Sequence, residues 1–117
     1  MDTLISFFKA LADPNRVRIV ALLLEAGELC VCDIERVLGL PQARISRHLT
    51  FLRNARVVKA RRNGQWMHYS ITPCCALEKG VYRELRKALG GIAELEADRA
   101  ALRSTLCACA PVTVPVP

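Results

Sequence analysis

The sequence predicts a mainly α-helical protein with one small β-hairpin, folded as a winged helix-turn-helix and paired as a homodimer. Two segments with helical spacing of apolar residues meet at a tight turn containing Gly39, and the second has a basic outer face. An Asn63-Gly64 pair, which is a strong hairpin signal, follows soon after. The length of 117 residues fits a single domain.

Four helices are expected in the first half of the chain, because apolar residues recur there at helical spacing. These helices cover residues 3–11, 14–25, 31–38 and 42–55. The second helix begins at Asp13-Pro14, which has the form of an N-cap followed by proline in the first helical position. In the fourth, Ile45, Leu49 and Leu52 share one face and are expected to point into the core.

The wing is expected directly after the fourth helix. It consists of a strand over 57–60, a basic turn over 61–64 and a returning strand over 65–71. Thr72-Pro73 is then expected to open a long last helix, again as a cap followed by proline. Gly90-Gly91 marks a bend or weak point in that helix.

The long last helix carries an apolar stripe at helical spacing. Its members are Leu77, Val81, Leu85, Ala88, Ile92, Leu95, Leu102 and Leu106. A core this small cannot cover so long a stripe, so we expect the first and last helices to form the homodimer interface. The winged helix-turn-helix and dimerisation domain is expected over 1–106, followed by a flexible tail over 107–117 that is rich in proline and contains cysteine.

Charge is distributed unevenly along the chain. Residues 36–77 hold eight Lys or Arg and no acid, whereas the rest holds nine basic and eleven acidic residues. A block of unopposed cations is what phosphate neutralisation requires, so the sequence favours a nucleic-acid partner over a merely solvated basic face. No secretion signal and no apolar stretch of membrane-spanning length is recognised, so we expect a cytoplasmic protein that does not enter a membrane.

Six cysteines fall into three close pairs: Cys30/Cys32, Cys74/Cys75 and Cys107/Cys109. Close pairs are poor partners for structural disulfides, and clustered thiols in a reducing compartment more often bind metals or act in redox chemistry. The chain has no Cys-x-x-Cys, and its two histidines lie in the expected DNA-facing segments. The sequence therefore gives no support for an enzyme and predicts no catalytic residue and no catalytic cofactor.

Three motifs occur in order along the chain: LADPNR at 11–16, ELCVCD at 28–33 and ISRHL at 45–49. With the wing after them, they resemble the ArsR/SmtB family of metal-sensing repressors over about residues 3–89. ELCVCD in particular is similar to the arsenic- and antimony-sensing branch and to some cadmium or lead sensors. The resemblance implies a homodimeric transcriptional repressor that binds palindromic double-stranded operator DNA and releases it when an effector binds.

The DNA-reading surface is expected on the outer face of the fourth helix and at the hairpin tip. An arginine can bind guanine in bidentate fashion and a glutamine can bind adenine, while hydroxyl and imidazole groups can bind phosphate or a base. The candidate residues are Gln42, Arg44, Ser46, Arg47, His48, Arg61, Arg62 and Asn63. Arg53 and Arg56 are expected to be solvated instead.

The metal-ligand candidates are Cys30 and Cys32. Cys30 occupies an expected helix-cap position three residues before Asp33, where serine or threonine would cap better. A thiol in the first turn of a helix has a lowered pKa, and its thiolate binds soft ions such as arsenite or antimonite. On an ideal helix the two residues lie about 200° apart, so we expect joint ligation to require unwinding of the first turn, which would misplace the recognition helix.

The resemblance also implies a third cysteine at a position that here holds Glu35. Cys107 or Cys109 is the expected substitute, a two-thiol site completed by solvent or a small thiol is equally open, and Cys74 and Cys75 could form a separate site. Other interpretations stay open at this point. They are a repressor of the same fold that senses cadmium, lead or thiol oxidation, a sequence-neutral nucleic-acid-binding protein, and, more weakly, a thiol redox enzyme.

Overall fold

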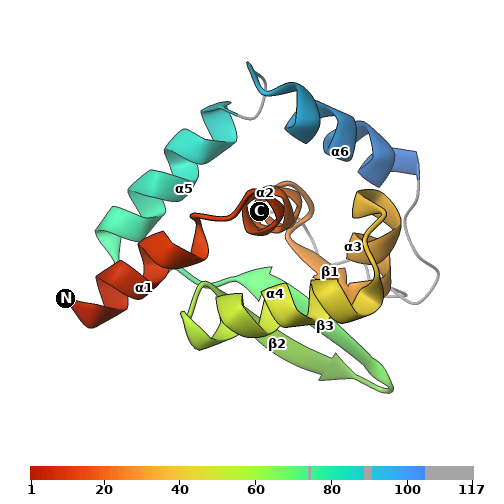
Figure 1. Cartoon of the computed structure of the whole chain (residues 1–117), viewed down its shortest axis with the longest axis horizontal. Coiled ribbons are helices and arrows are strands. Elements are labelled where there is room, and N and C mark those ends of the chain that lie inside the picture. The colour runs from red at the N-terminus through yellow and green to blue at the C-terminus, as the bar shows by residue number, and fades with distance from the viewer. Residues whose placement is uncertain (74, 89–90, 105–117) are drawn as a thin grey trace.

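The computed structural model describes residues 1–73, 75–88 and 91–104. Within these residues the chain forms six helices and one three-stranded sheet (Figure 1). In chain order the elements are α1 (Asp2–Ala10), α2 (Pro14–Ala26), β1 (Glu28–Cys30), α3 (Val31–Leu38), α4 (Gln42–Asn54), β2 (Val58–Asn63), β3 (Trp66–Ile71), α5 (Ala76–Ala88) and α6 (Ala93–Ser104). The winged helix-turn-helix predicted from the sequence is confirmed.

Helix α2 is the central element, and α3, α4, α5 and α6 surround it (Figure 1). The predicted cap at its start is confirmed, because the Asp13 carboxylate accepts hydrogen bonds from the backbone N–H groups of Asn15 at 2.8 Å and Arg16 at 3.2 Å. Its side chains Ile19, Val20, Leu22 and Leu23 are buried in the main core.

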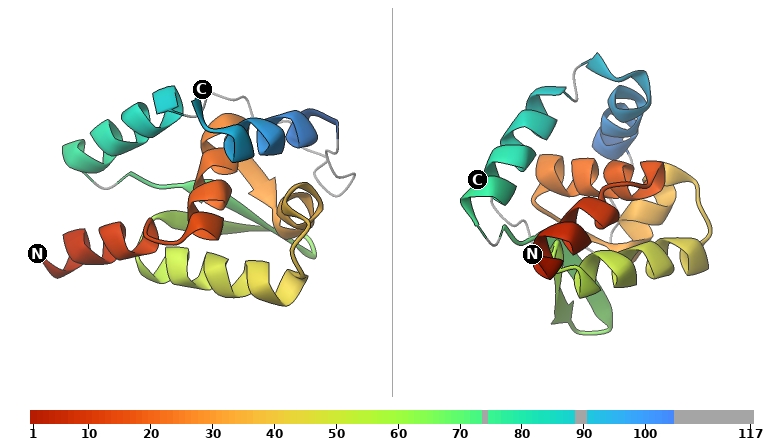
Figure 2. Two further views of the ribbon diagram at one scale, coloured as in Figure 1. Left: turned by 45° about the horizontal axis from the view of Figure 1, so that its top comes forward. Right: turned by 60° about the vertical axis from the view of Figure 1, so that its left-hand side comes forward.

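Helix α4 packs on this core as its sequence predicts. Ile45, Leu49 and Leu52 are fully buried, so the opposite face of the helix is left to solvent. The β2–β3 hairpin projects from the same side of the molecule as α4, as the right-hand view of Figure 2 shows. Gly64 has a φ of +65° at the turn, a left-handed conformation that favours glycine.

A third strand joins the hairpin and was not predicted. The strand order is β1-β3-β2, and both pairs are antiparallel. In this register His68 of β3 lies opposite Cys30 of β1 on one side and opposite Arg61 of β2 on the other. The three residues of β1 are too few to show the alternation by which a strand is recognised, and their pairing partner is about forty residues away.

The expected helix start at Thr72-Pro73 is wrong, because helix α5 begins at Ala76. The backbone N–H of Thr72 donates to the carbonyl of Val57 at 2.9 Å, which extends the strand pairing one residue past β3. Thr72 and Pro73 therefore belong to the connection and not to the helix.

The single long helix is also replaced by two helices, α5 and α6, that run in different directions (Figure 1). Helix α6 packs on α2 and α3 (Figure 1). Leu95 and Leu102 are buried there, and Arg18 pairs with Asp98 in bidentate fashion at 2.9 Å. The expectation that the whole stripe forms a dimer face is therefore wrong for Leu95 and Leu102, which pack on the chain's own helices, whereas Ile92 is exposed. Leu106 lies outside the described residues.

The first half of the stripe remains partly uncovered. Leu77 of α5 and Ile5 and Phe8 of α1 are exposed, and α1 and α5 meet through an edge-to-face contact of Phe7 with Tyr82, with ring centroids 5.6 Å apart. A dimer interface through α1 and α5 stays a prediction. In the described part of the chain, no helix combines the length and apolarity needed to cross a bilayer.

Candidate functional site

The two sulfurs of Cys30 and Cys32 lie side by side at the junction of β1 and α3, with their Sγ atoms 2.8 Å apart. Cys30 ends β1 and is also the N-cap of α3, with extended φ and ψ of −86° and 165°. Cys32 follows in the first helical turn. The predicted cap position is confirmed, and no side-chain hydrogen bond to the helix backbone is made there.

This arrangement overturns the expectation that the helix must unwind before the two sulfurs can share an ion. The angle of about 200° applies to two helical residues, whereas Cys30 has an extended backbone that returns its side chain toward Cys32. Two sulfurs that bind one ion at about 2.3 Å lie about 3.5 Å apart, so ligation needs only a small separation of these atoms.

Asp33 completes the cluster and was missed as a donor in the sequence. The Cys30 thiol donates to Oδ2 of Asp33 at 3.3 Å, and one ligand atom from each of the three residues lies within 4.8 Å of the others. Cys30 is 1% exposed and Asp33 is fully buried, while Cys32 is half-buried and gives access from solvent. The capping-box position of Asp33, three residues after Cys30, is the signal that could have identified it.

The donor set is two sulfurs and one carboxylate oxygen. Reduced and deprotonated cysteines bind soft ions, and a carboxylate can complete the coordination of a borderline ion. Of the other sulfur candidates, Cys74, Cys107 and Cys109 lie outside the described residues. Cys75 is exposed, and its Sγ lies 4.0 Å from Oε2 of Glu78, so it is not part of the cluster.

The predicted DNA-facing residues of the fourth helix all lie on α4. Gln42, Arg44 and Arg47 are exposed, and Ser46 and His48 are partly exposed. Among the described residues, neither Arg44 nor Arg47 forms an ion pair. These two guanidinium groups are therefore available to an external anion.

Arg16 of α2 joins this surface, which the sequence did not predict. Its guanidinium lies 4.1 Å from the ring centroid of Phe51, and its Nε donates to the carbonyl of Ala10 at 2.8 Å. Arg16 and Phe51 line a hollow of about 370 Å³ together with Arg44, Arg47 and His48. Arg16 is thus held in place beside the freely exposed arginines.

The wing residues Arg61, Arg62 and Asn63 were predicted in the turn, but they are the last three residues of strand β2. Arg61 has a partner inside the protein. Its Nη2 and Nε donate to the two carboxylate oxygens of Glu28, at 2.6 and 3.2 Å. The hydrogen bond from Arg61 lowers the pKa of Glu28. Arg62 is exposed and forms no ion pair with the described residues.

A cross-strand row connects the sulfur cluster to the wing. Cys30, His68 and Arg61 lie opposite one another on adjacent strands, so their side chains share one face of the sheet. Glu28 lies two residues before Cys30, hence on the same face, and contacts both Arg61 and Nδ1 of His68, the latter at 3.9 Å. A displacement of β1 would therefore be transmitted to β2.

Comparison with known proteins gives a consistent set of relatives. A family model described as "Bacterial regulatory protein, arsR family" matches residues 13–60. The chain is 49% identical over 69 residues to the arsenical resistance operon repressor of Escherichia coli K12, and this match covers 59% of each chain. It is 39% identical over 93 residues to the arsenic resistance transcriptional regulator ArsR2 of Pseudomonas putida, covering 80% of this chain and 79% of the relative.

A cadmium resistance regulator is also similar, namely the CadC homolog of Staphylococcus aureus, at 42% identity over 64 residues and covering 55% of this chain and 53% of the relative. The matches thus span only a little over half the length of several of these relatives, including the repressor of E. coli.

Two solved structures show the same fold. HlyU of Vibrio cholerae superposes with a TM-score of 0.66 at 28% identity and covers 74% of this chain and 90% of its own. The transcriptional repressor PagR of Bacillus anthracis superposes with a TM-score of 0.63 at 32% identity, covering 72% and 93%.

Proposed function

Because the chain belongs to the arsR family of bacterial regulatory proteins, we propose that it is a transcriptional repressor that leaves its operator when trivalent arsenic or antimony binds Cys30 and Cys32. The observation that carries this proposal is the 2.8 Å separation of the two sulfurs at the N-cap of α3. Relatives named for arsenic resistance support the choice of effector.

The DNA-binding step rests on α4 and the wing. A helix of this kind enters the major groove with its outer residues toward the base edges. Arg44 and Arg47 are exposed and without ion pairs in the described chain, so they retain their charge for phosphate or guanine. We assign Gln42, Ser46 and His48 to the same interface, with Arg62 and Asn63 at the wing.

Release of DNA follows from the position of the cysteines between two DNA-binding parts. Helix α3 packs against α4, and β1 pairs with β3 of the wing. An ion bound to Cys30 and Cys32 replaces the Cys30–Asp33 hydrogen bond and shifts the end of β1. The shift reaches α4 through α3, and it reaches Arg61 through Glu28, so that the effector and DNA favour different conformations.

The protein acts as a homodimer in this proposal, with α1 and the apolar face of α5 at the interface. Exposed Ile5, Phe8 and Leu77 provide the apolar area. Two copies related by a two-fold axis would present two α4 helices to a palindromic site, as dimeric helix-turn-helix proteins do. Apart from this dimer, the proposal needs no other protein and no membrane.

Cadmium or lead is the second candidate effector. The observation that favours it is Asp33, because a carboxylate oxygen beside two sulfurs suits a divalent borderline ion better than it suits arsenic. A relative named for cadmium resistance points the same way.

The test is effector-driven release of a labelled DNA duplex, obtained by selection from random sequence and followed by fluorescence anisotropy under reducing conditions. Arsenite, antimonite, cadmium and lead are titrated into complexes of the parent, of the Cys30→Ser/Cys32→Ser variant and of Cys75→Ser as the matched control. We expect arsenite or antimonite to release the parent and Cys75→Ser while the double variant stays bound. Release of the double variant at the same arsenite concentration would refute the assignment, and release of the parent by cadmium alone would select the second candidate.

A further inference from the structure

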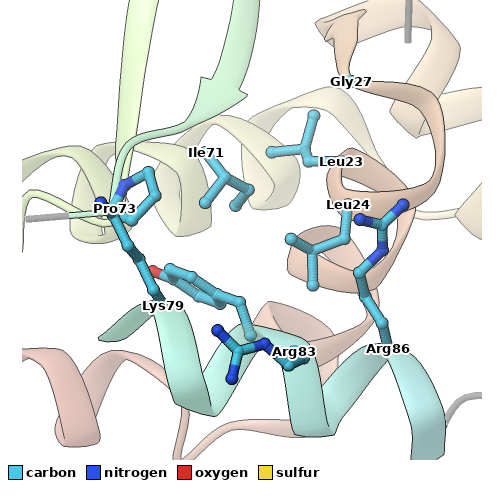
Figure 3. A pocket seen from close by; sticks show the side chains of 9 residues that line it. Leu23, Leu24, Gly27, Ile71, Pro73, Lys79, Arg83 and Arg86 are labelled. Atoms are coloured by element: carbon cyan, nitrogen blue, oxygen red, sulfur yellow. The ribbon is translucent and has the colours of Figure 1, made fainter. Parts of the chain in front are cut away.

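A hollow of about 440 Å³ lies between α2, the end of β3 and α5, and it includes no residue of α4 or of the sulfur cluster (Figure 3). Leu23 and Leu24 of α2 and Ile71 of β3 form one side. Across from them, α5 contributes Lys79, Arg83 and Arg86, as Figure 3 shows. A volume of this size suits a small organic ligand.

The three cations of the hollow have no acidic partner in the part of the chain that the structure describes. None of Lys79, Arg83 and Arg86 forms an ion pair with any residue among 1–73, 75–88 and 91–104, and no Asp or Glu lines the hollow. Lys87 of the same helix, by contrast, pairs with Glu84 at 3.4 Å. Three like charges at one concave place repel one another, and an anion bound there relieves the repulsion.

The opposite side of the hollow is apolar. Leu23 is 1% exposed, and Leu24 and Ile71 are partly exposed toward the hollow. An inorganic anion would leave this apolar surface in contact with water, whereas a ligand with an alkyl or aromatic body would cover it. A hollow with cations on one side and apolar side chains on the other therefore favours an amphipathic anion as its ligand.

Two of the three cations lie away from the predicted dimer face, while Arg83 also borders Leu77 and Val81 of that face. Lys79 and Arg86 lie about 150° around the helix from Val81, which is in the middle of the apolar stripe of α5. A second copy seated on Leu77 and Val81 would therefore leave these two cations open to small molecules.

We propose that the hollow is a binding site for a small amphipathic carboxylate, with the carboxylate at Arg83 and Arg86 and the apolar body on Leu23, Leu24 and Ile71. A carboxylate is chosen because a guanidinium binds it in bidentate fashion with two parallel hydrogen bonds. The site is independent of metalloid sensing, since it shares no residue with the Cys30–Cys32–Asp33 cluster.

The test is calorimetric titration of the full, reduced chain with octanoate, compared with 1-octanol and acetate. We expect saturable binding of one octanoate per chain. Both comparison compounds should bind at least about tenfold more weakly, because 1-octanol lacks the carboxylate and acetate lacks the long alkyl chain. The Arg83→Gln/Arg86→Gln variant is expected to weaken octanoate binding by at least about tenfold. Lys87→Gln, outside the hollow on the same helix, is the matched control and should bind like the parent.

The proposal is overturned if octanoate does not bind saturably, as would occur if the partner subunit covered the hollow. It is equally overturned if 1-octanol binds as tightly as octanoate, or if the double variant keeps the parent's affinity. If the double variant loses its helical circular dichroism, Lys79→Gln is tested in its place as a milder change. We then expect Lys79→Gln to bind octanoate about threefold more weakly than the parent. Unchanged affinity in Lys79→Gln under that condition would also overturn the proposal.

Discussion

Helices α4 and α6 use charge in opposite ways. On α4 the apolar residues Ile45, Leu49 and Leu52 are fully buried, and the outward arginines Arg44 and Arg47 have no acidic partner among the described residues. On α6 two charged residues face the protein, where Asp98 binds Arg18 at 2.9 Å and Arg99 binds Glu25 at 3.3 Å. The unpaired charges of α4 are available to an external polyanion, and the paired charges of α6 hold that helix on the core.

The largest expected effect lies on the side with unpaired charges. Replacing both arginines in Arg44→Ala/Arg47→Ala should weaken DNA binding by about 100-fold or more, because each contact contributes about 1–3 kcal/mol. Thermal stability should stay close to that of the parent, since both side chains are exposed. Anisotropy at several salt concentrations measures the first effect and should also give a flatter salt dependence. Arg53→Ala is the control. If the double variant binds DNA with an affinity within threefold of the parent's, the unpaired arginines of α4 do not form the DNA-binding surface.

The next effect tests whether α6 belongs to the core. Leu102 is 6% exposed, so Leu102→Ala should lower the free energy of unfolding by about 3 kcal/mol. Leu77 is 48% exposed, so Leu77→Ala should cost much less stability and instead weaken the dimer. Urea denaturation and sedimentation equilibrium measure the two quantities. If Leu102→Ala altered only the dimer, α6 would be an interface helix after all.

The smallest effect concerns the ion pair between β1 and the wing. The pKa of Glu28 is lowered in the folded state by Arg61, so the pair stabilises the protein above the ordinary value of 4.5 and loses this contribution as pH falls through the lowered pKa. Glu28→Gln should therefore have a lower melting temperature than the parent at neutral pH. The difference between the two melting temperatures should shrink as the pH falls through the lowered pKa of Glu28. Melting curves across this range measure it. A difference that grows in acid would show that Glu28 is not ionised in the folded protein.

Local signals in the sequence were sufficient for the helix-turn-helix. The Asp13-Pro14 cap and the apolar spacing of Ile45, Leu49 and Leu52 each act within a few residues, and the structure confirms both. The same holds for the cap position of Cys30. The Asn63-Gly64 pair predicted the hairpin correctly, but the turn lies one residue later, at Gly64 and Gln65, because Asn63 pairs with Trp66.

Features that depend on distant partners were not predictable in this way. An apolar stripe looks the same whether it meets its own core or a second subunit, so the return of α6 onto α2 could not be read from Leu95 and Leu102. Strand β1 exists because β3 pairs with it, and that pairing fixes the extended backbone of Cys30. The approach of the sulfurs and the third donor Asp33 follow from this conformation, which helical geometry alone missed.

The central claim is that Cys30 and Cys32 jointly bind the effector in the conformation that the fold already provides. X-ray absorption at the arsenic edge of the arsenite-loaded, reduced protein counts the sulfurs bound to arsenic directly. We expect at least two arsenic–sulfur bonds in the parent and in Cys75→Ser, and their loss in Cys30→Ser/Cys32→Ser. An unchanged sulfur coordination in that double variant would contradict this claim.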